Sequence, residues 1–134
     1  MGKADVQKYT FRTFVSNADV DENPTAGARS HDVLNGPCQV YSLSGKNTHA
    51  TTVFYLKVYD NTAPSEGTTD PDYVFRLEAN KAFGPYTFGA IAGQIKGHKF
   101  SNGLSYACVT TAGTGGTTGP GDNEVKAVFD VEKL

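Results

Sequence analysis

Short segments in which apolar and polar residues alternate, each followed by turn-forming residues, constrain the fold of this 134-residue chain more than any other feature. Alternation with a period of two puts every second side chain on the same face of a β-strand. The clearest case is TTVFYLKVY at 51–59, which is rich in the β-branched and aromatic residues that strands favour. One face of this strand would hold Phe54, Leu56 and Val58, and the opposite face Tyr55, Lys57 and Tyr59.

Alternation of the same kind recurs along the chain, at 6–16, 38–44, 73–78, 95–100, 104–108 and 125–131. Segment 82–88 is also apolar but contains Gly84-Pro85. We expect an edge strand or a bulge there, because proline cannot donate a ladder hydrogen bond. Stretches rich in turn-forming residues separate these segments at 17–27, 60–72 and 112–123. Helical periodicity covers at most one turn, within 83–94.

The number and spacing of these segments predict an all-β fold. We expect an antiparallel two-sheet sandwich of jelly-roll type with about eight or nine strands, and a closed barrel as the second choice. The chain has the size of a single domain and no internal repeat. We expect residues 1–35 to form an N-terminal strand and an arm or loop that contacts neighbouring subunits, and residues 36–134 to form the sandwich body.

Charge and the length of the apolar segments argue against two classes of partner. The chain has 12 basic and 14 acidic residues and no basic run, so we expect no nucleic-acid partner. No segment approaches the ~20 apolar residues of a membrane span, so we expect no membrane partner. The polar start, residues 1–6, has no apolar signal segment and indicates synthesis in a cytoplasm.

The two cysteines, Cys38 and Cys108, lie in apolar strand-like segments far apart in sequence. We expect buried, reduced thiols, because a cytoplasm keeps thiols reduced and buried cysteines behave as small apolar residues. A disulfide would require the two strands to lie side by side, and that alternative stays open at this point. Neither cysteine has a second Cys or His at the spacing of zinc ligands.

Catalytic and metal-binding patterns are incomplete in this sequence. Ser30-His31-Asp32 contains the residue types of a catalytic triad, but strand neighbours point to opposite faces, so we interpret the triplet as a chance feature of a solvated loop. The other histidines, His49 and His98, lie in separate segments. We therefore predict no catalytic residue, no metal site and no cofactor.

Three groups of acidic residues leave alternatives open. Asp19, Asp21 and Asn23 resemble the start of a calcium loop, but Pro24 and Ser30 occupy the positions that require glycine and glutamate. A calcium site stays open there, as it does around Asp70-Pro71-Asp72, and solvated acids are the simpler interpretation. Glu66 and Glu78 have the residue type of a glycosidase pair, but their separation does not follow from the sequence.

Five tyrosines could line a sugar-binding platform: Tyr41, Tyr55, Tyr59, Tyr73 and Tyr86. Tyrosines on sandwich strands more often pack at the edge of the core or against a neighbouring subunit. The chain has no tryptophan, which is the usual residue for stacking on sugars.

Two stretches carry strand-and-turn motifs. YLKVYDNTAP at 55–64, followed by Gly67-Thr68 and Pro71, is similar to a strand of the form F-x-K-x-Y-[DN]-x-A-x-A-P that leads into a G-T-x-x-P turn. FSNGLSYA at 100–107 is similar to an F-S-T-G-L-S-Y-A turn and strand. With the Gly/Thr-rich loop and valine-rich end that follow, residues 38–134 resemble small structural proteins of phage particles. Residues 1–35 have no counterpart in this pattern.

This resemblance implies a component of the virion, made in the host cytoplasm, most often a capsid decoration (cement) protein or a fibre-base module. The implied partners are the major capsid protein and further copies of the chain, with a homotrimer favoured. No catalytic residue belongs to the pattern. Non-catalytic stabilisation of the head shell is the first hypothesis, a tail or fibre module that binds host glycan is the alternative, and a sandwich-fold glycan hydrolase is the third.

For the interface we select exposed segments and the aromatic or proline residues beside them. The segments are the arm at 1–27 and the loops at 60–72 and 112–123. The candidate residues are Tyr9, Phe11, Arg12, Pro24, Tyr59, Pro64, Pro71 and Tyr73.

Overall fold

The computed structural model describes residues 7–15, 31–65, 67–116, 118–120 and 124–134, and for residues 7–15, 31–35 and 95 it describes the backbone. Its described part is all-β, without a helix. The strands are β1 (Gln7–Val15), β2 (His31–Asn35), β3 (Cys38–Asn47), β4 (Phe54–Tyr59), β5 (Tyr73–Leu77), β6 (Lys81–Thr87), β7 (Ala90–Ile91), β8 (Gln94–Ile95), β9 (His98–Phe100), β10 (Gly103–Val109) and β11 (Val125–Lys133). No described helix is long and apolar enough to cross a membrane.

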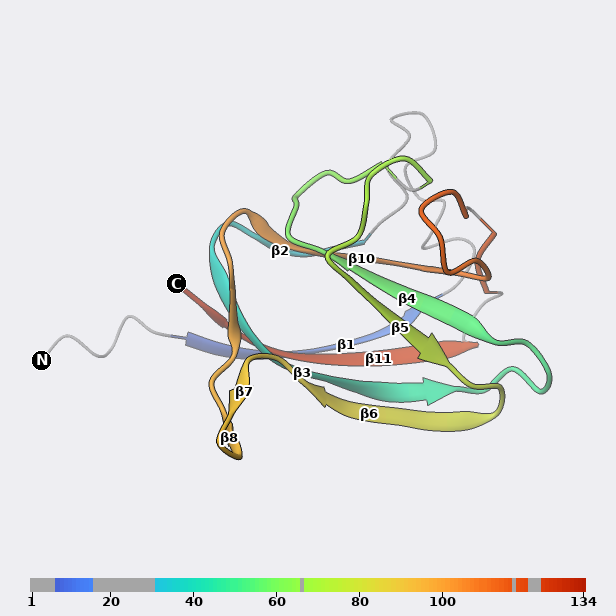
Figure 1. Cartoon of the computed structure of the whole chain (residues 1–134), viewed down its shortest axis with the longest axis horizontal. Coiled ribbons are helices and arrows are strands. Elements are labelled where there is room, and N and C mark those ends of the chain that lie inside the picture. Colours follow the sequence, from blue (N-terminus) through green and yellow to red (C-terminus); the bar gives the residue numbers. More distant parts are fainter. Residues whose placement is uncertain (1–6, 16–30, 66, 117, 121–123) are drawn as a thin grey trace, which may run out of the picture.

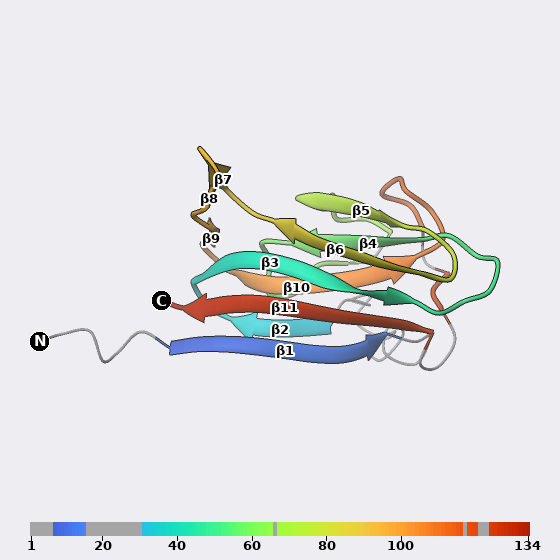
Figure 2. The ribbon, with the colours of Figure 1, turned by 90° about the horizontal axis from the view of Figure 1, so that it is seen from below.

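Two antiparallel sheets face one another (Figures 1 and 2). The first has the order β1-β11-β3-β6, with β9 also paired to β3, and the second has the order β2-β10-β4-β5. The pairs are nested: β4 with β5, β3 with β6, β2 with β10, and β1 with β11. A long hairpin whose successive pairs alternate between two sheets is a jelly roll. The predicted antiparallel sandwich is therefore confirmed.

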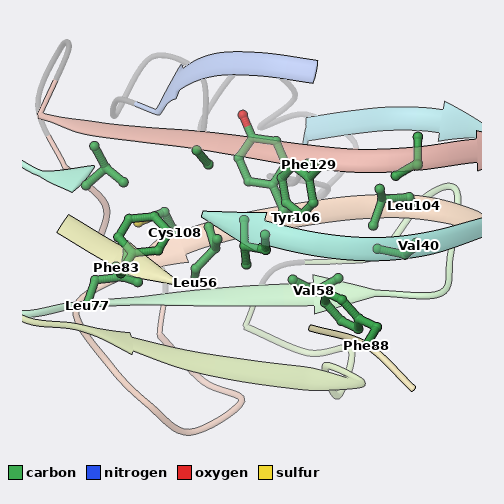
Figure 3. Packing of buried hydrophobic residues seen from close by; sticks show 14 of the residues in the cluster. Val40, Leu56, Val58, Leu77, Phe83, Phe88, Leu104, Tyr106, Cys108 and Phe129 are labelled. Atoms are coloured by element: carbon green, nitrogen blue, oxygen red, sulfur yellow. The ribbon is translucent and has the colours of Figure 1, made fainter. Parts of the chain in front are cut away.

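The core lies between the sheets and is built from the alternating residues that the sequence pattern identified. In β11, Val125, Ala127, Phe129 and Val131 are all buried. Phe129 packs against Tyr106 of the facing sheet, with ring centroids 5.7 Å apart, and Figure 3 shows both rings between the two layers. Burial of large apolar side chains from both sheets is the main force that holds a sandwich together.

Strand β6 has the character expected from Gly84-Pro85. It pairs with β3 and lies at the end of its sheet. No further strand there needs the N–H group that proline lacks. The pairing slips between Leu43 and Gly45, opposite the Gly84-Pro85 segment. Both the predicted edge position and the predicted irregularity are confirmed.

Two elements differ from the sequence interpretation. His31 and Asp32 lie in strand β2, paired with Tyr106 and Ser105 of β10, so the interpretation of this segment as a loop was wrong. Segment 90–95, which showed no strand pattern, forms the β7–β8 hairpin. In both places backbone pairing with a partner strand holds a few residues extended. Such short strands do not need an alternating pattern of apolar residues, so the sequence does not reveal them.

Strands β1 and β2 belong to the two sheets, so residues 7–15 and 31–35 are part of the sandwich. Cys38 and Cys108 are buried, and neither forms a disulfide bond. They lie in different sheets, on β3 and β10. The prediction of buried, reduced thiols is confirmed.

Candidate interaction surfaces

The outer face of the sheet β2-β10-β4-β5 is covered by loops. Lys57 and Tyr59 in β4, and Ser105, Ala107 and Val109 in β10, alternate with core residues and so point away from the other sheet, yet all are buried. Figure 1 shows the loops after β4 and after β10 on this side of the sheet. Pro64 of the first loop and Gly116 and Pro120 of the second are themselves buried. The loops therefore form a fixed outer layer.

Lys57 fastens the second of these loops. Its side chain is fully buried, and its Nζ donates a hydrogen bond to the carbonyl oxygen of Gly113. Thr114 Oγ1 donates to Asp70 Oδ1 over 2.6 Å and so joins the two loops, while Thr110 N donates to Thr118 O over 2.9 Å. The charge of Lys57 and its aliphatic stem thus hold the loop against the sheet.

Replacing Lys57 by alanine is expected to lower the free energy of unfolding by about 2–3 kcal/mol, because about three buried methylenes and the bond to Gly113 are lost. Lys46 offers the control: it is exposed on β3, and its replacement by alanine should change stability by less than about 0.5 kcal/mol. Urea unfolding followed by circular dichroism measures both. Equal stability of the two variants would contradict a fastening role for Lys57.

Asp60, at the end of β4, joins the two motif-bearing stretches. Its Oδ1 accepts hydrogen bonds from Asn102 N at 2.8 Å and Gly103 N at 3.3 Å, and its Oδ2 accepts one from Ser101 N at 3.0 Å. Asp60 N donates to Asp72 Oδ2 over 2.6 Å. Three backbone donors on one carboxylate hold the turn before β10 firmly, because hydrogen bonds to a charged acceptor are strong.

A second bond strengthens the same junction. Ser105 Oγ donates to the carbonyl oxygen of Asn61 over 2.6 Å, and β10 pairs with β4 along its length from Ser105–Tyr59 to Val109–Tyr55. The stretches 55–64 and 100–107 are therefore neighbours in space and are hydrogen-bonded to each other.

Asp60 also acts on Cys38. Burial raises the pKa of the Cys38 thiol from 9.0 to about 11, and the negative charge of Asp60 adds to the rise. The folded state thus holds this proton more tightly than the unfolded state. Its contribution to stability is complete below pH 9 and is lost as the pH rises towards about 11.

We expect the free energy of unfolding to fall across this alkaline range, and the fall to be shallower in Cys38→Ala. Urea unfolding of both proteins at several pH values measures the two slopes. The alanine variant starts from a lower stability because a core side chain is shortened, so the comparison concerns the slope and not the level. Identical slopes would show that the Cys38 thiol does not contribute.

Stacked aromatic rings close the side of the sandwich between the edge strands β5 and β6. We call Phe83, Tyr86, Phe75, Tyr73 and Phe100 the aromatic ladder. Successive ring centroids are 6.3, 4.8, 6.2 and 6.2 Å apart, with interplanar angles of 8–18°. Phe88 meets Tyr73 edge-on at 4.9 Å. Tyr73, Phe75 and Tyr86 are half-buried, so the ladder seals the core and also forms part of the surface.

The five tyrosines considered for sugar binding do not gather on one surface. Tyr41 lies on β3, where its hydroxyl donates to Glu132 Oε1 over 2.5 Å, a bond that contributes most to raising the pKa of Tyr41 to about 12. Tyr55 accepts a hydrogen bond from Arg76 Nη1 at 2.9 Å, and Tyr59 is buried. Tyr73 and Tyr86 belong to the aromatic ladder.

The candidate interface residues are dispersed. Tyr9, Phe11 and Arg12 lie in β1, opposite Val131, Phe129 and Val128 of β11, and only their backbone is described. Pro24 lies outside the described residues, as does most of the proposed arm. Tyr59 and Pro64 are buried within the chain itself, so they support the surface from beneath. Pro71 and Tyr73 are half-buried and reach the surface side by side with Asp72. Their role in an interface stays a prediction.

Metal-ligating side chains do not gather in the ranges that the structure describes. No group of three His, Cys, Asp or Glu side chains there could hold a metal ion. The imidazole of His49 accepts hydrogen bonds at Nδ1 from Thr51 N and Thr52 N, which makes it part of the β3–β4 turn. Glu78 pairs with Arg76 at 2.6 Å, and Glu66, Asp19 and Asp21 lie outside the described residues.

The sequence interpretation missed one surface feature. The β7–β8 hairpin with its flanking residues, 89–97, which we call the finger, projects from the body in both views (Figures 1 and 2). Residues 89–94 are all exposed. The signal that marks it is the spacing of Gly89, Gly93 and Gly97 around two isoleucines.

Comparisons with known proteins add no relative. No protein-family model matches the chain, and searches of curated proteins and of solved structures found no match.

Proposed function

We propose that this chain is a structural protein of a phage particle, a capsid decoration protein that stabilises the head shell by binding the major capsid protein and its own copies. It acts by non-catalytic packing within the virion, after synthesis in the host cytoplasm.

The observation that carries this proposal is the junction at Asp60. The two stretches that resemble phage structural proteins lie 36 or more positions apart in sequence, yet Asp60 of the first accepts three backbone hydrogen bonds from the turn of the second. Hydrogen bonds between the two motifs support one shared structural signature, because the carboxylate in the first motif and the backbone donors in the second form a single junction. Residues such as Asp60, Asn61 and Asn102-Gly103 then serve the fold and not a reaction.

The architecture is compatible with this role. Jelly rolls recur in viral capsid domains, although the fold alone does not decide a function. A decoration protein has to keep its shape on a crowded shell. Here Lys57 and Asp60 hold the loops to the sheet, and Asp70 joins the two loops to each other. Individually modest contacts suffice on a shell, because many copies bind to a repeated lattice.

Purified chain mixed with expanded heads of the phage that encodes it tests the proposal. We expect saturable co-sedimentation and a rise in the temperature at which the shell releases its DNA. Unexpanded heads and heads of an unrelated phage serve as controls. Absence of binding to expanded heads would contradict the proposal, and retention of the chain on immobilised host glycan instead would favour a tail or fibre module.

A further inference from the structure

The finger presents an apolar side chain at its tip. Ile91 is 64% exposed, more than the other exposed large hydrophobic residues of the described chain, Leu134 at 54% and Val74 at 42%. A single exposed aliphatic residue is common on protein surfaces. Ile91 differs because it stands on a hairpin that projects from the body, where a second molecule can reach it from several sides.

The backbone of the finger has a defined shape. Ala92 and Gly93 both have positive φ, 52° and 79°, and connect Ile91 to its pairing partner Gln94 in a two-residue turn. At the root, Gly89 and Gly97 also have positive φ and touch: a Cβ on Gly89 would lie 2.2 Å from the carbonyl oxygen of Gly97. These two glycines let the chain turn sharply away from the sheet.

The root is bound to β3 at several points. Phe88 N donates to Tyr41 O over 3.0 Å, and Gln39 Nε2 donates to Lys96 O over 3.0 Å. Gly97 lies directly on the Tyr41 ring, whose hydroxyl is bonded to Glu132. An isolated two-stranded hairpin is marginally stable in water. Here the anchored root orients the finger before any partner binds, which reduces the entropy that binding would cost.

The charged residues nearest to the finger in sequence are lysines, and the acidic Glu132 lies beyond the Tyr41 ring at its root. Residues 89–95 carry no charge, and Lys96 and Lys99 follow directly at its base. Both lysines are exposed, and neither has an ion-pair partner in the part of the chain that the structure describes. The finger therefore has an apolar residue at its tip and two lysines at its root. A complementary surface would have an exposed apolar residue beside carboxylates.

The same chain carries such a surface on its other sheet. Val74 of β5 pairs with Lys57 of β4 and, like Lys57, points outward, but it lies beyond the cover of the loops. Asp70 and Asp72, both exposed, precede it. Each has one carboxylate oxygen bonded within the chain, to Thr114 and to Asp60 respectively. The neighbouring Arg76 is already paired with Glu78.

We propose that the finger of one copy packs Ile91 against Val74 of a second copy, with Lys96 and Lys99 of the first facing Asp70 and Asp72 of the second. The finger is rooted on one sheet and Val74 lies on the outer face of the other, so the contact joins two copies head to tail. Repetition of such a contact gives a ring when the rotation closes. This inference rests on the proposed function, in which copies touch one another on the shell.

Two variants of the full chain test the head-to-tail contact. Ile91→Asp removes the finger tip and Val74→Asp removes its receptor, and each should weaken self-association by at least about tenfold in analytical ultracentrifugation. Leu134→Asp is the matched control, because it changes an apolar residue outside the contact whose exposure lies between those of Ile91 and Val74. It should associate like the wild type. Thermal unfolding of all three verifies that they are folded.

Mixing the two variants gives the decisive result. Ile91→Asp retains the receptor and Val74→Asp retains the finger, so an equimolar mixture should form dimers that grow no further. A mixture that stays monomeric would overturn the head-to-tail contact, as would a wild-type chain that is monomeric throughout. The double variant Lys96→Glu, Lys99→Glu should weaken association more at low salt than at high salt. An equal loss of affinity at both salt concentrations would overturn the charge pairing.

Binding of the same variants to expanded heads separates this inference from the proposed function. A monomeric wild type that still coats heads would sink the contact and leave the decoration role intact. A wild type that associates through Ile91 and Val74 but does not bind heads would sink the decoration role and leave the contact intact.

Discussion

Replacing Gly45 by alanine is expected to destabilise the fold by more than about 4 kcal/mol, at the extreme end of single substitutions. A Cβ at this position would lie 1.9 Å from the backbone oxygen of Lys126 and 2.7 Å from Cζ of Phe83. The ring of Phe83 can shift, but the oxygen belongs to the ladder between β3 and β11. Relief of the clash would therefore separate two strands at the centre of a sheet, which costs more than ordinary overpacking of a core.

Gly113→Ala is the matched control for this experiment. It adds the same methyl group to a loop position with no heavy atom within 4 Å, and it keeps the carbonyl that accepts the bond from Lys57. Its stability should lie within about 0.5 kcal/mol of the wild type. Urea unfolding and the far-ultraviolet spectrum compare the two proteins. A Gly45→Ala variant as stable as Gly113→Ala would show that β3 and β11 are not packed as closely as described.

The second large effect is expected at Phe129. Its side chain is fully buried at the centre of β11, between Leu43 of β3 and Phe11 of β1 in the strand register, and it packs on Tyr106 of the facing sheet (Figure 3). Phe129→Ala removes contacts that span both sheets and leaves a cavity. The expected loss is about 3–5 kcal/mol, equivalent to a fall in Tm of roughly 10–20 °C.

Val128→Ala tests whether the loss of stability depends on which face of β11 a side chain occupies. Val128 is the neighbour of Phe129, points to the other face and is half-buried, so its truncation should cost less than about 1.5 kcal/mol. Differential scanning calorimetry compares the two variants. Similar losses at 128 and 129 would mean that β11 has no distinct core face.

Parts of the fold were predictable because they depend on neighbours in sequence. The alternation in β4 identified Phe54, Leu56 and Val58 as its core face, and all three are buried. Gly84-Pro85 identified an edge strand with an irregularity. These inferences need only the two-residue period of a strand and the missing donor of proline. The burial of Cys38 and Cys108 followed in the same way from their apolar surroundings.

Other parts depended on contacts between distant segments. The alternation in β4 separated Lys57 and Tyr59 from the core face, but it did not reveal that these residues are buried. Their burial results from loops that return from residues 60–72 and 110–120 to cover the sheet. For the same reason Tyr59 and Pro64, chosen as interface residues for their type, lie beneath the surface.

The amino-acid sequence alone determined that strands would form, where most of them begin and end, and that they would stack in two layers, because a strand with one apolar face must bury it against another. It did not determine which strands are neighbours, that Asp60 meets the turn at 101–103, or that the finger stands clear of the body. Those features arise from pairing and close approach between segments tens of residues apart, and such contacts are specified by the assembled backbone.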